Sequence, residues 1–122
     1  MTLTNNNESK WDVQLRKGTL ELVILASLKG RKLYGLELLN LLKSFETTIL
    51  TEGTLYPLLD RLKRDGLICA EWVQEGDARP RKYFSLTSNG DEKLTIVSKR
   101  WRQSVEDISY LLTHPGPEPL NR

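Results

Sequence analysis

The chain has 122 residues, of which 39% are hydrophobic and 28% are charged, and its formal net charge at pH 7 is +2. This length and composition suit one globular domain with a single core, and the near-neutral charge neither demands nor excludes a nucleic-acid partner. No run of about 18 apolar residues occurs and Met1–Ser9 lacks the pattern of a signal peptide, so we expect a cytoplasmic protein without a membrane partner.

The first predicted helix follows a polar start. Residues 1–9 include the run Asn5–Asn7 and little apolar character, so this segment is predicted to be disordered. From Lys10 to Leu28, apolar residues recur at helical spacing on more than one side, which indicates a helix with more than one packing neighbour. Gly30 marks its end.

Two further helices are predicted before any ribbon. Leucines dominate residues 35–45, which predicts a second helix ending near Phe45, and the β-branched Thr47–Ile49 favour one short strand. Thr51 is the expected cap of a third helix that closes at Gly66. Helical steps of 100° place four leucines on one side of this helix and a polar surface opposite. The leucines are Leu55, Leu58, Leu59 and Leu62, and the polar surface comprises Gly53, Pro57, Asp60 and Arg64, flanked by Tyr56 and Arg61.

A two-stranded ribbon and a long helix complete the predicted fold. Residues 67–74 and 81–86 alternate in polarity around a turn at Glu75–Pro80, which is typical of paired strands. Thr87 or Ser88 then caps the last helix, which ends before the proline-rich tail at residues 114–122, predicted to be disordered. We therefore predict a mainly α fold with a small β ribbon: a winged helix-turn-helix domain at residues 10–87 and a dimerisation helix at 88–113.

The last helix carries an apolar stripe that a winged-helix core does not need. Leu94, Trp101 and Ile108 recur every seven residues, as do Val105 and Leu112. We predict that this stripe packs with the first helix against a second copy of the chain; folding back onto its own first helix is the alternative. The predicted dimer interface comprises Trp11, Leu15, Leu94, Val97, Trp101, Val105, Ile108 and Leu112.

The order helix, strand, turn, strand suggests a reader of double-stranded DNA, because a short helix fits the major groove and a basic ribbon tip reaches the flanking backbone. Between residues 51 and 90, six basic residues are matched by six acidic ones, yet three of the basic ones cluster at one turn. The candidate DNA contacts in the third helix are Thr54, Tyr56, Pro57, Arg61 and Arg64, and those in the ribbon are Arg79, Arg81 and Lys82. The alternatives are that Tyr56 only packs, that Pro57 only shapes the turn, and that the helix arginines pair with Asp60 or Asp65. For Arg81 and Lys82, the alternative is that they only keep the ribbon soluble and block edge pairing.

Enzymatic chemistry and metal binding are not predicted. The sequence holds one histidine, His114, in the tail, so no nucleophile and base can be paired, and no metal-ligand or phosphate-loop spacing occurs. The single cysteine, Cys69, lies in an apolar run and is predicted to be a packing residue. We expect no catalytic activity, cofactor or metal. A winged helix that binds a protein without specific DNA binding remains the alternative function.

The sequence resembles the PadR family of bacterial transcriptional regulators between about Leu15 and Trp101. The matching pieces are Arg16–Leu20, Leu33–Gly35, Gly53–Leu62, Asp65–Ile68, Arg81–Thr87 and Gly90. The resemblance implies a homodimeric winged helix-turn-helix repressor of the short branch with one C-terminal helix, and it adds Tyr34 to the candidate DNA contacts. In proteins of this kind aromatic compounds can bind at the dimer interface, which makes Trp101, with Val97 and Trp11, the candidate effector site; the alternative is that Trp101 is a core residue. Phe84 and the basic turn Arg31–Lys32 depart from the usual pattern.

Overall fold

The computed structural model describes residues 9–116, which form four helices and three strands. The helices are α1 (Lys10–Ser27), α2 (Gly35–Lys43), α3 (Glu52–Arg64) and α4 (Ser88–Thr113), and the strands are β1 (Leu33–Tyr34), β2 (Ile68–Val73) and β3 (Arg81–Leu86). The predicted mainly α class with a small β ribbon is confirmed. Most of the two segments predicted to be disordered, residues 1–9 and 114–122, lies outside the described residues.

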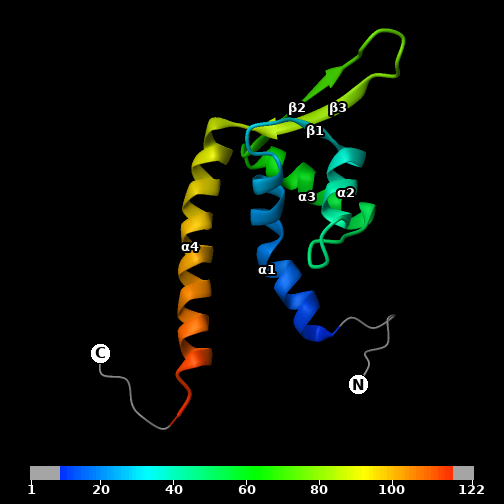
Figure 1. The fold of residues 1–122 in the computed structure, drawn as a ribbon. Helices are drawn as coiled ribbons and strands as arrows, with labels where there is room; N and C mark the ends of the chain where they lie inside the picture. The colour runs from blue at the N-terminus through cyan, green and yellow to red at the C-terminus, as the bar shows by residue number, and fades with distance from the viewer. Residues whose placement is uncertain (1–8, 117–122) are drawn as a thin grey trace.

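The sheet lies at one end of the molecule, and the helices extend away from it (Figure 1). Its strand order is β1-β3-β2 and both pairings are antiparallel. The long helix α4 descends from the sheet beside α1, whereas the β2–β3 ribbon continues beyond the helices in the opposite sense (Figure 1). We call this ribbon, with its turn at residues 74–80, the wing.

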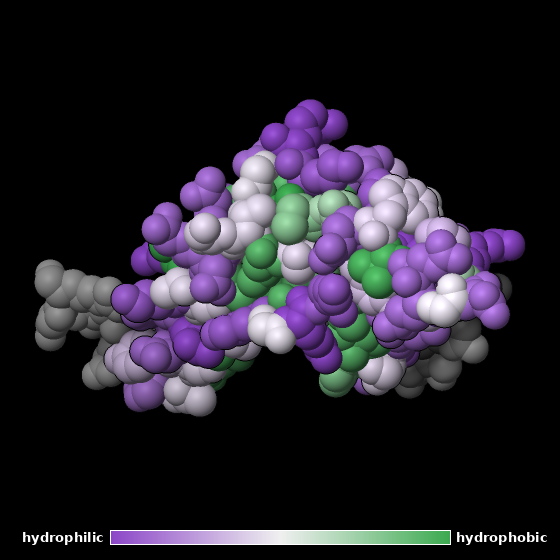
Figure 2. All heavy atoms as spheres, turned by 90° about the horizontal axis from the view of Figure 1, so that it is seen from above, coloured by the Kyte–Doolittle hydropathy of each residue, from purple (hydrophilic) through white to green (hydrophobic). Residues whose placement is uncertain are grey.

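A leucine-rich core joins the helices to the inner face of the sheet. Its buried residues come from every helix and from β2 and β3, and α3 contributes Leu55, Leu58, Leu59 and Leu62. The predicted alternation of the ribbon is confirmed by the register, which pairs Ile68 with Leu86 and Ala70 with Phe84 on the inner face. Seen from above the sheet, the surface is mainly hydrophilic with separate apolar patches (Figure 2). Within residues 9–116, no helix combines the length and apolar character needed to cross a bilayer.

The junction between wing and α4 is fixed by Thr87, the N-cap of α4. Its hydroxyl donates to the Gly66 carbonyl oxygen at 2.6 Å and accepts from the Gly90 amide at 3.0 Å, while its own amide donates to the Leu67 carbonyl oxygen at 3.1 Å. One threonine thus binds the end of the α3 segment to the start of α4. Because all three partners of Thr87 are backbone groups, these bonds fix where α4 begins relative to the sheet.

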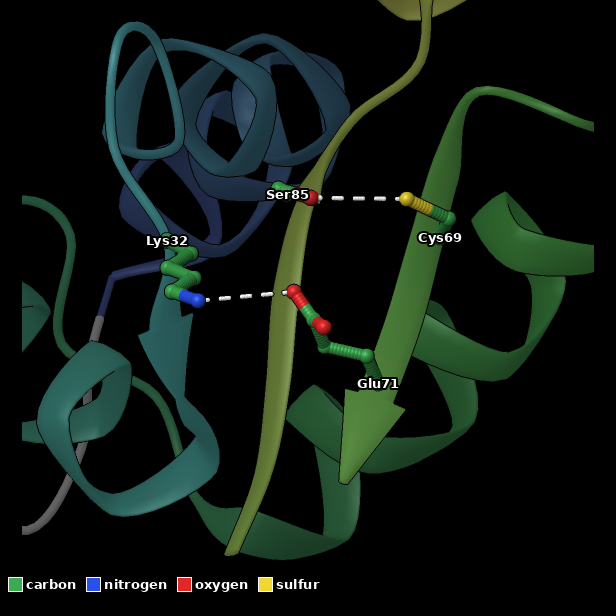
Figure 3. Close-up of polar contacts among 4 residues, drawn as sticks. All are labelled: Lys32, Cys69, Glu71 and Ser85. Atoms are coloured by element: carbon green, nitrogen blue, oxygen red, sulfur yellow. Dashed lines mark hydrogen bonds and ion pairs between the residues drawn. The ribbon is translucent and has the colours of Figure 1, made fainter. Parts of the chain in front are cut away.

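Three local predictions were wrong. Thr47–Ile49 form no strand; the Thr48 hydroxyl instead donates to the Leu42 carbonyl oxygen at 2.6 Å near the end of α2, and the additional strand is Leu33–Tyr34, paired with β3. Phe45 lies beyond α2, after the C-cap Ser44, and is exposed. Cys69 is exposed rather than packed, because it projects from the outer face of the sheet, where its Sγ lies 3.4 Å from Ser85 Oγ (Figure 3).

Candidate nucleic-acid interface

Helix α3 presents the polar surface that its sequence predicts. The four leucines of its opposite side are between 0% and 7% exposed, so the helix is anchored in the core along its whole length. The residues exposed on the other side include every candidate DNA contact of this helix, namely Thr54, Tyr56, Pro57, Arg61 and Arg64. Burial of one side therefore fixes which side chains can reach a ligand.

The first turn of α3 combines an imperfect cap with an internal proline. Thr51 occupies the N-cap position, but its hydroxyl meets the Thr54 hydroxyl at 3.3 Å and caps no backbone amide. Pro57 lies inside the helix and offers no amide hydrogen to Gly53, the residue four positions earlier. Because the Thr51 side chain caps no amide, the N-terminal end of α3 has amide donors and two threonine hydroxyls, which suits contact with an acceptor-rich ligand.

Tyr56 is held in place by a glycine in a different helix. A Cβ atom at Gly35, in the first turn of α2, would collide with the hydroxyl and the ring of Tyr56. The side chain is nevertheless 40% exposed, so one part of it packs on α2 while another part stays accessible. The packing alternative and the contact alternative for Tyr56 are therefore compatible.

Arg61 has an ion-pair partner that the sequence did not indicate. Its Nη2 lies 3.6 Å from Oε1 of Glu21 in α1, and Oε2 of the same carboxylate lies 3.3 Å from Lys93 Nζ in α4. Glu21 thus links α1, α3 and α4 through partly exposed charges, where each pair contributes at most about 1 kcal/mol. No periodicity or motif could have revealed this set, because its members are distant in the sequence.

An open groove of about 900 Å³ lies beside Arg61 and Arg64, between α1, α3 and α4. Four basic side chains line it, Lys17, Arg61, Arg64 and Arg100, together with Thr54, Pro57 and the carboxylate of Glu21. Lys17 and Arg100 were not among the predicted site residues. Their one available signal in the sequence is positive charge, which they share with many solvated residues.

The wing cations do not all point in one direction. Register places Arg81 opposite Val73 on the outer face of the sheet and Lys82 opposite Trp72 on the inner face. Arg81 lies over the Tyr34 ring, with its guanidinium carbon 4.6 Å from the ring centroid, and Lys82 Nζ lies 5.7 Å from the Phe84 centroid. Arg79 is exposed in the turn. The wing therefore offers positive charge on both faces and at its tip.

The predicted dimer stripe divides into two parts. Leu94 is 5% exposed and belongs to the chain's own core, so it leaves the proposed interface. This part of α4 follows the alternative of packing on the same chain, where α1 is its neighbour. Val97 is half-buried, and the other predicted interface residues stay exposed in the isolated chain: Trp11, Leu15, Trp101, Val105, Ile108 and Leu112.

The candidate effector residues are only partly brought together. Trp101 and Val97 both line the groove beside α3, and Trp101 also lines a second groove of about 530 Å³ between α1 and α4. That second groove is mainly apolar, with Leu15, Leu22, Val23 and Val105 among its walls. Trp11 lies at the start of α1 and lines neither groove within a single chain.

Comparison with known proteins agrees with this architecture. A model of the transcriptional regulator PadR-like family matches residues 24–96. A PadR-like transcriptional regulator from Bacillus cereus is 31% identical, with a TM-score of 0.77 over 84% of this chain and 99% of that one. A PadR family regulator from Eggerthella lenta is 33% identical, with a TM-score of 0.73 over 84% and 89% of the two chains. A PadR-like transcription factor from Bacteroides fragilis is 37% identical, with a TM-score of 0.68 over 84% and 99%.

Proposed function

The chain belongs to the PadR-like family of transcriptional regulators, and from that premise we propose that it is a sequence-specific repressor that binds a two-fold related operator as a homodimer. A DNA-binding transcriptional regulator is the function that the family carries. The observation that supports our finer proposal is the joint exposure, on one rigid scaffold, of the polar side of α3 and the basic wing. A regulator of this kind acts on chromosomal DNA, so we place it in the cytoplasm.

In this proposal α3 enters the major groove and the wing holds the flanking backbone. Thr54 lies near the N-terminal end of α3, the end that usually meets base edges in helix-turn-helix proteins. Tyr56, Arg61 and Arg64 are better suited to phosphate contacts, which fix the register of the helix without reading sequence. The basic groove beside α3 extends this positive surface toward α4.

The homodimer part of the proposal rests on exposed apolar surface. Side chains as large as Trp101 and Ile108 are about half exposed along one side of α4, and a soluble monomer rarely exposes such a continuous patch. A second copy related by a two-fold axis would cover it with the same residues. The symmetric dimer then presents two copies of α3 to successive turns of the major groove.

A small aromatic ligand is the proposed release signal. The groove of about 530 Å³ between α1 and α4 is within the size range of small-molecule sites and is mainly apolar, with Trp101 in its wall. A ligand that stacked on Trp101 would bind between the helices that we assign to the dimer interface. Quenching of tryptophan fluorescence by a panel of aromatic compounds, lost in Trp101→Leu, tests this assignment.

Footprinting on the chain's own promoter is expected to show protection on both sides of a two-fold centre. The spacing should follow dimer geometry, with half-site centres about 34 to 36 Å apart, or one helical turn. Substituting Thr54 by alanine should relax the preference at one base position by about 1 to 3 kcal/mol, because base-edge contacts carry sequence information. Protection of one half-site alone, at saturating protein, would contradict the dimeric arrangement.

The triple variant Arg79→Ala/Arg81→Ala/Lys82→Ala is expected to bind every DNA sequence more weakly. Each lost phosphate contact should reduce the slope of log affinity against log salt by about 0.9, while the preferred sequence stays the same. The measurement is a titration of operator and random duplexes at several salt concentrations. An unchanged slope and affinity would remove the wing from the interface and favour the alternative function, a winged helix that binds a protein.

A further inference from the structure

We propose that Tyr34 is a positioning residue for DNA binding, whose ring holds the guanidinium of Arg81 at the start of β3, beside the turn of the wing. The guanidinium carbon lies 4.6 Å from the ring centroid, within the distance of about 6 Å at which a cation is attracted to an aromatic face. Tyr34 was expected to touch DNA itself. The inference rests on the proposed operator-binding function and assigns Tyr34 a different part in it.

Tyr34 connects the start of α2 to the wing. It is the N-cap of α2, and its amide donates to Oε1 of Glu37 at 3.1 Å. Its strand pairing partner is Tyr83, and the two rings meet edge to face with centroids 5.4 Å apart and planes at 80°. The bond to Glu37, the strand pairing and the edge-to-face ring contact therefore hold this half-buried residue in place, and the Arg81 side chain lies over a supported ring.

The basic turn before β1, a departure from the family pattern, adds a second contact to the wing. Lys32 reaches across β3 to Glu71 on β2, where Nζ and Oε1 lie 3.4 Å apart (Figure 3). The same Nζ lies 5.6 Å from the centroid of the Tyr83 ring. Lys32 and Tyr34 thus join one short segment to both strands of the wing. The ion pair is well exposed, so it contributes at most about 1 kcal/mol.

The contact with Tyr34 leaves Arg81 able to donate hydrogen bonds. A guanidinium carries five N–H donors, and one aromatic ring cannot occupy all of them. No carboxylate of residues 9–116 forms an ion pair with Arg81. A guanidinium that is already held in one orientation loses less conformational entropy on binding a phosphate than a mobile arginine side chain does. Arg79, in the exposed turn, has no comparable support among the described residues.

A double-mutant cycle tests the inference on the duplex defined by footprinting. Tyr34→Leu should weaken binding about 2- to 5-fold, the effect expected when a cation–π contact at an exposed site is lost. Tyr34→Phe should restore the affinity, because the ring remains. In the Arg81→Ala background, Tyr34→Leu should have no further effect. If the two losses multiply instead, or if Tyr34→Phe binds as weakly as Tyr34→Leu, Tyr34 acts through its own contact and the inference is overturned.

A second series keeps the test decisive if Tyr34→Leu does not fold. Phenylalanine analogues with increasing numbers of ring fluorines at position 34 have nearly the same shape but a progressively weaker negative face. Operator affinity should fall along this series, and equal affinity throughout would overturn the inference. If the proposed function itself is wrong, the unmodified chain will show no preference for any duplex. That result differs from equal affinity along the fluorinated series, and it would overturn the inference as well.

Discussion

Replacing Trp101 and Ile108 together by alanine is expected to convert the dimer into a monomer at micromolar concentration. Both side chains are about half exposed in the single chain and lie on the same side of α4, so in the proposed dimer the second copy would complete their burial. Truncating a large buried apolar side chain costs about 2 to 5 kcal/mol, and each substitution occurs twice in a symmetric dimer. Since 1.4 kcal/mol is about tenfold in dissociation constant, the pair of changes should raise that constant by several orders of magnitude.

Sedimentation of the unmodified and the double-variant chains gives the measurement, and Ile96→Ala gives the matched control. Ile96 is 57% exposed on the same helix but lies on the side opposite the stripe, so its removal should leave the dimer intact. Helix content should persist in the double variant, because neither Trp101 nor Ile108 belongs to the core of the chain. A monomeric unmodified chain, or equal effects of Ile96→Ala and the double variant, would contradict the proposed interface.

Periodicity predicted the helices and the ribbon because each element buries one side of its own sequence. The four leucines of α3 illustrate this: their spacing identified the buried side, and the exposed polar side followed from it. The alternation of the ribbon applies to Cys69 in the same way. It follows the buried Ile68 in the strand, so its side chain is expected on the outer, exposed face of the sheet. The short strand β1 could not be located in this way, because two residues become a strand only through their pairing with β3.

The contacts that organise the candidate site join residues that are distant in the sequence. Glu21 approaches Arg61 and Lys93, Gly35 accommodates Tyr56, and Tyr34 supports Arg81 only because the fold brings separate elements together. The sequence therefore identified candidate contact residues in α3 and the wing, but not the residues that position them. Gly35 had one local signal, because a glycine in the first turn of a leucine-rich helix is costly unless a neighbour needs the space.

Gly90→Ala is expected to destabilise the folded chain strongly. A Cβ atom at this position would collide with the carbonyl oxygen of Leu67, which is backbone and accepts the Thr87 amide at 3.1 Å. The obstacle cannot rotate away as a side chain would, so α4 must shift or the hydrogen bonds around Thr87 must break. Overpacking typically costs about 1 to 3 kcal/mol, and we expect a loss at the upper end of that range or beyond it.

Gly18→Ala provides a control of opposite sign, because it makes the same chemical change inside a helix. Nothing lies within 4 Å of a Cβ built at Gly18, and alanine is favoured over glycine in a helix interior by about 0.8 to 1 kcal/mol. Urea unfolding should be compared at one fixed protein concentration, since the midpoint of a dimer depends on concentration. We expect the midpoint to fall in Gly90→Ala and to rise in Gly18→Ala. Equal shifts in the two variants would mean that helix propensity, rather than the contact with Leu67, decides the outcome, and that the junction between the wing and α4 tolerates a displacement.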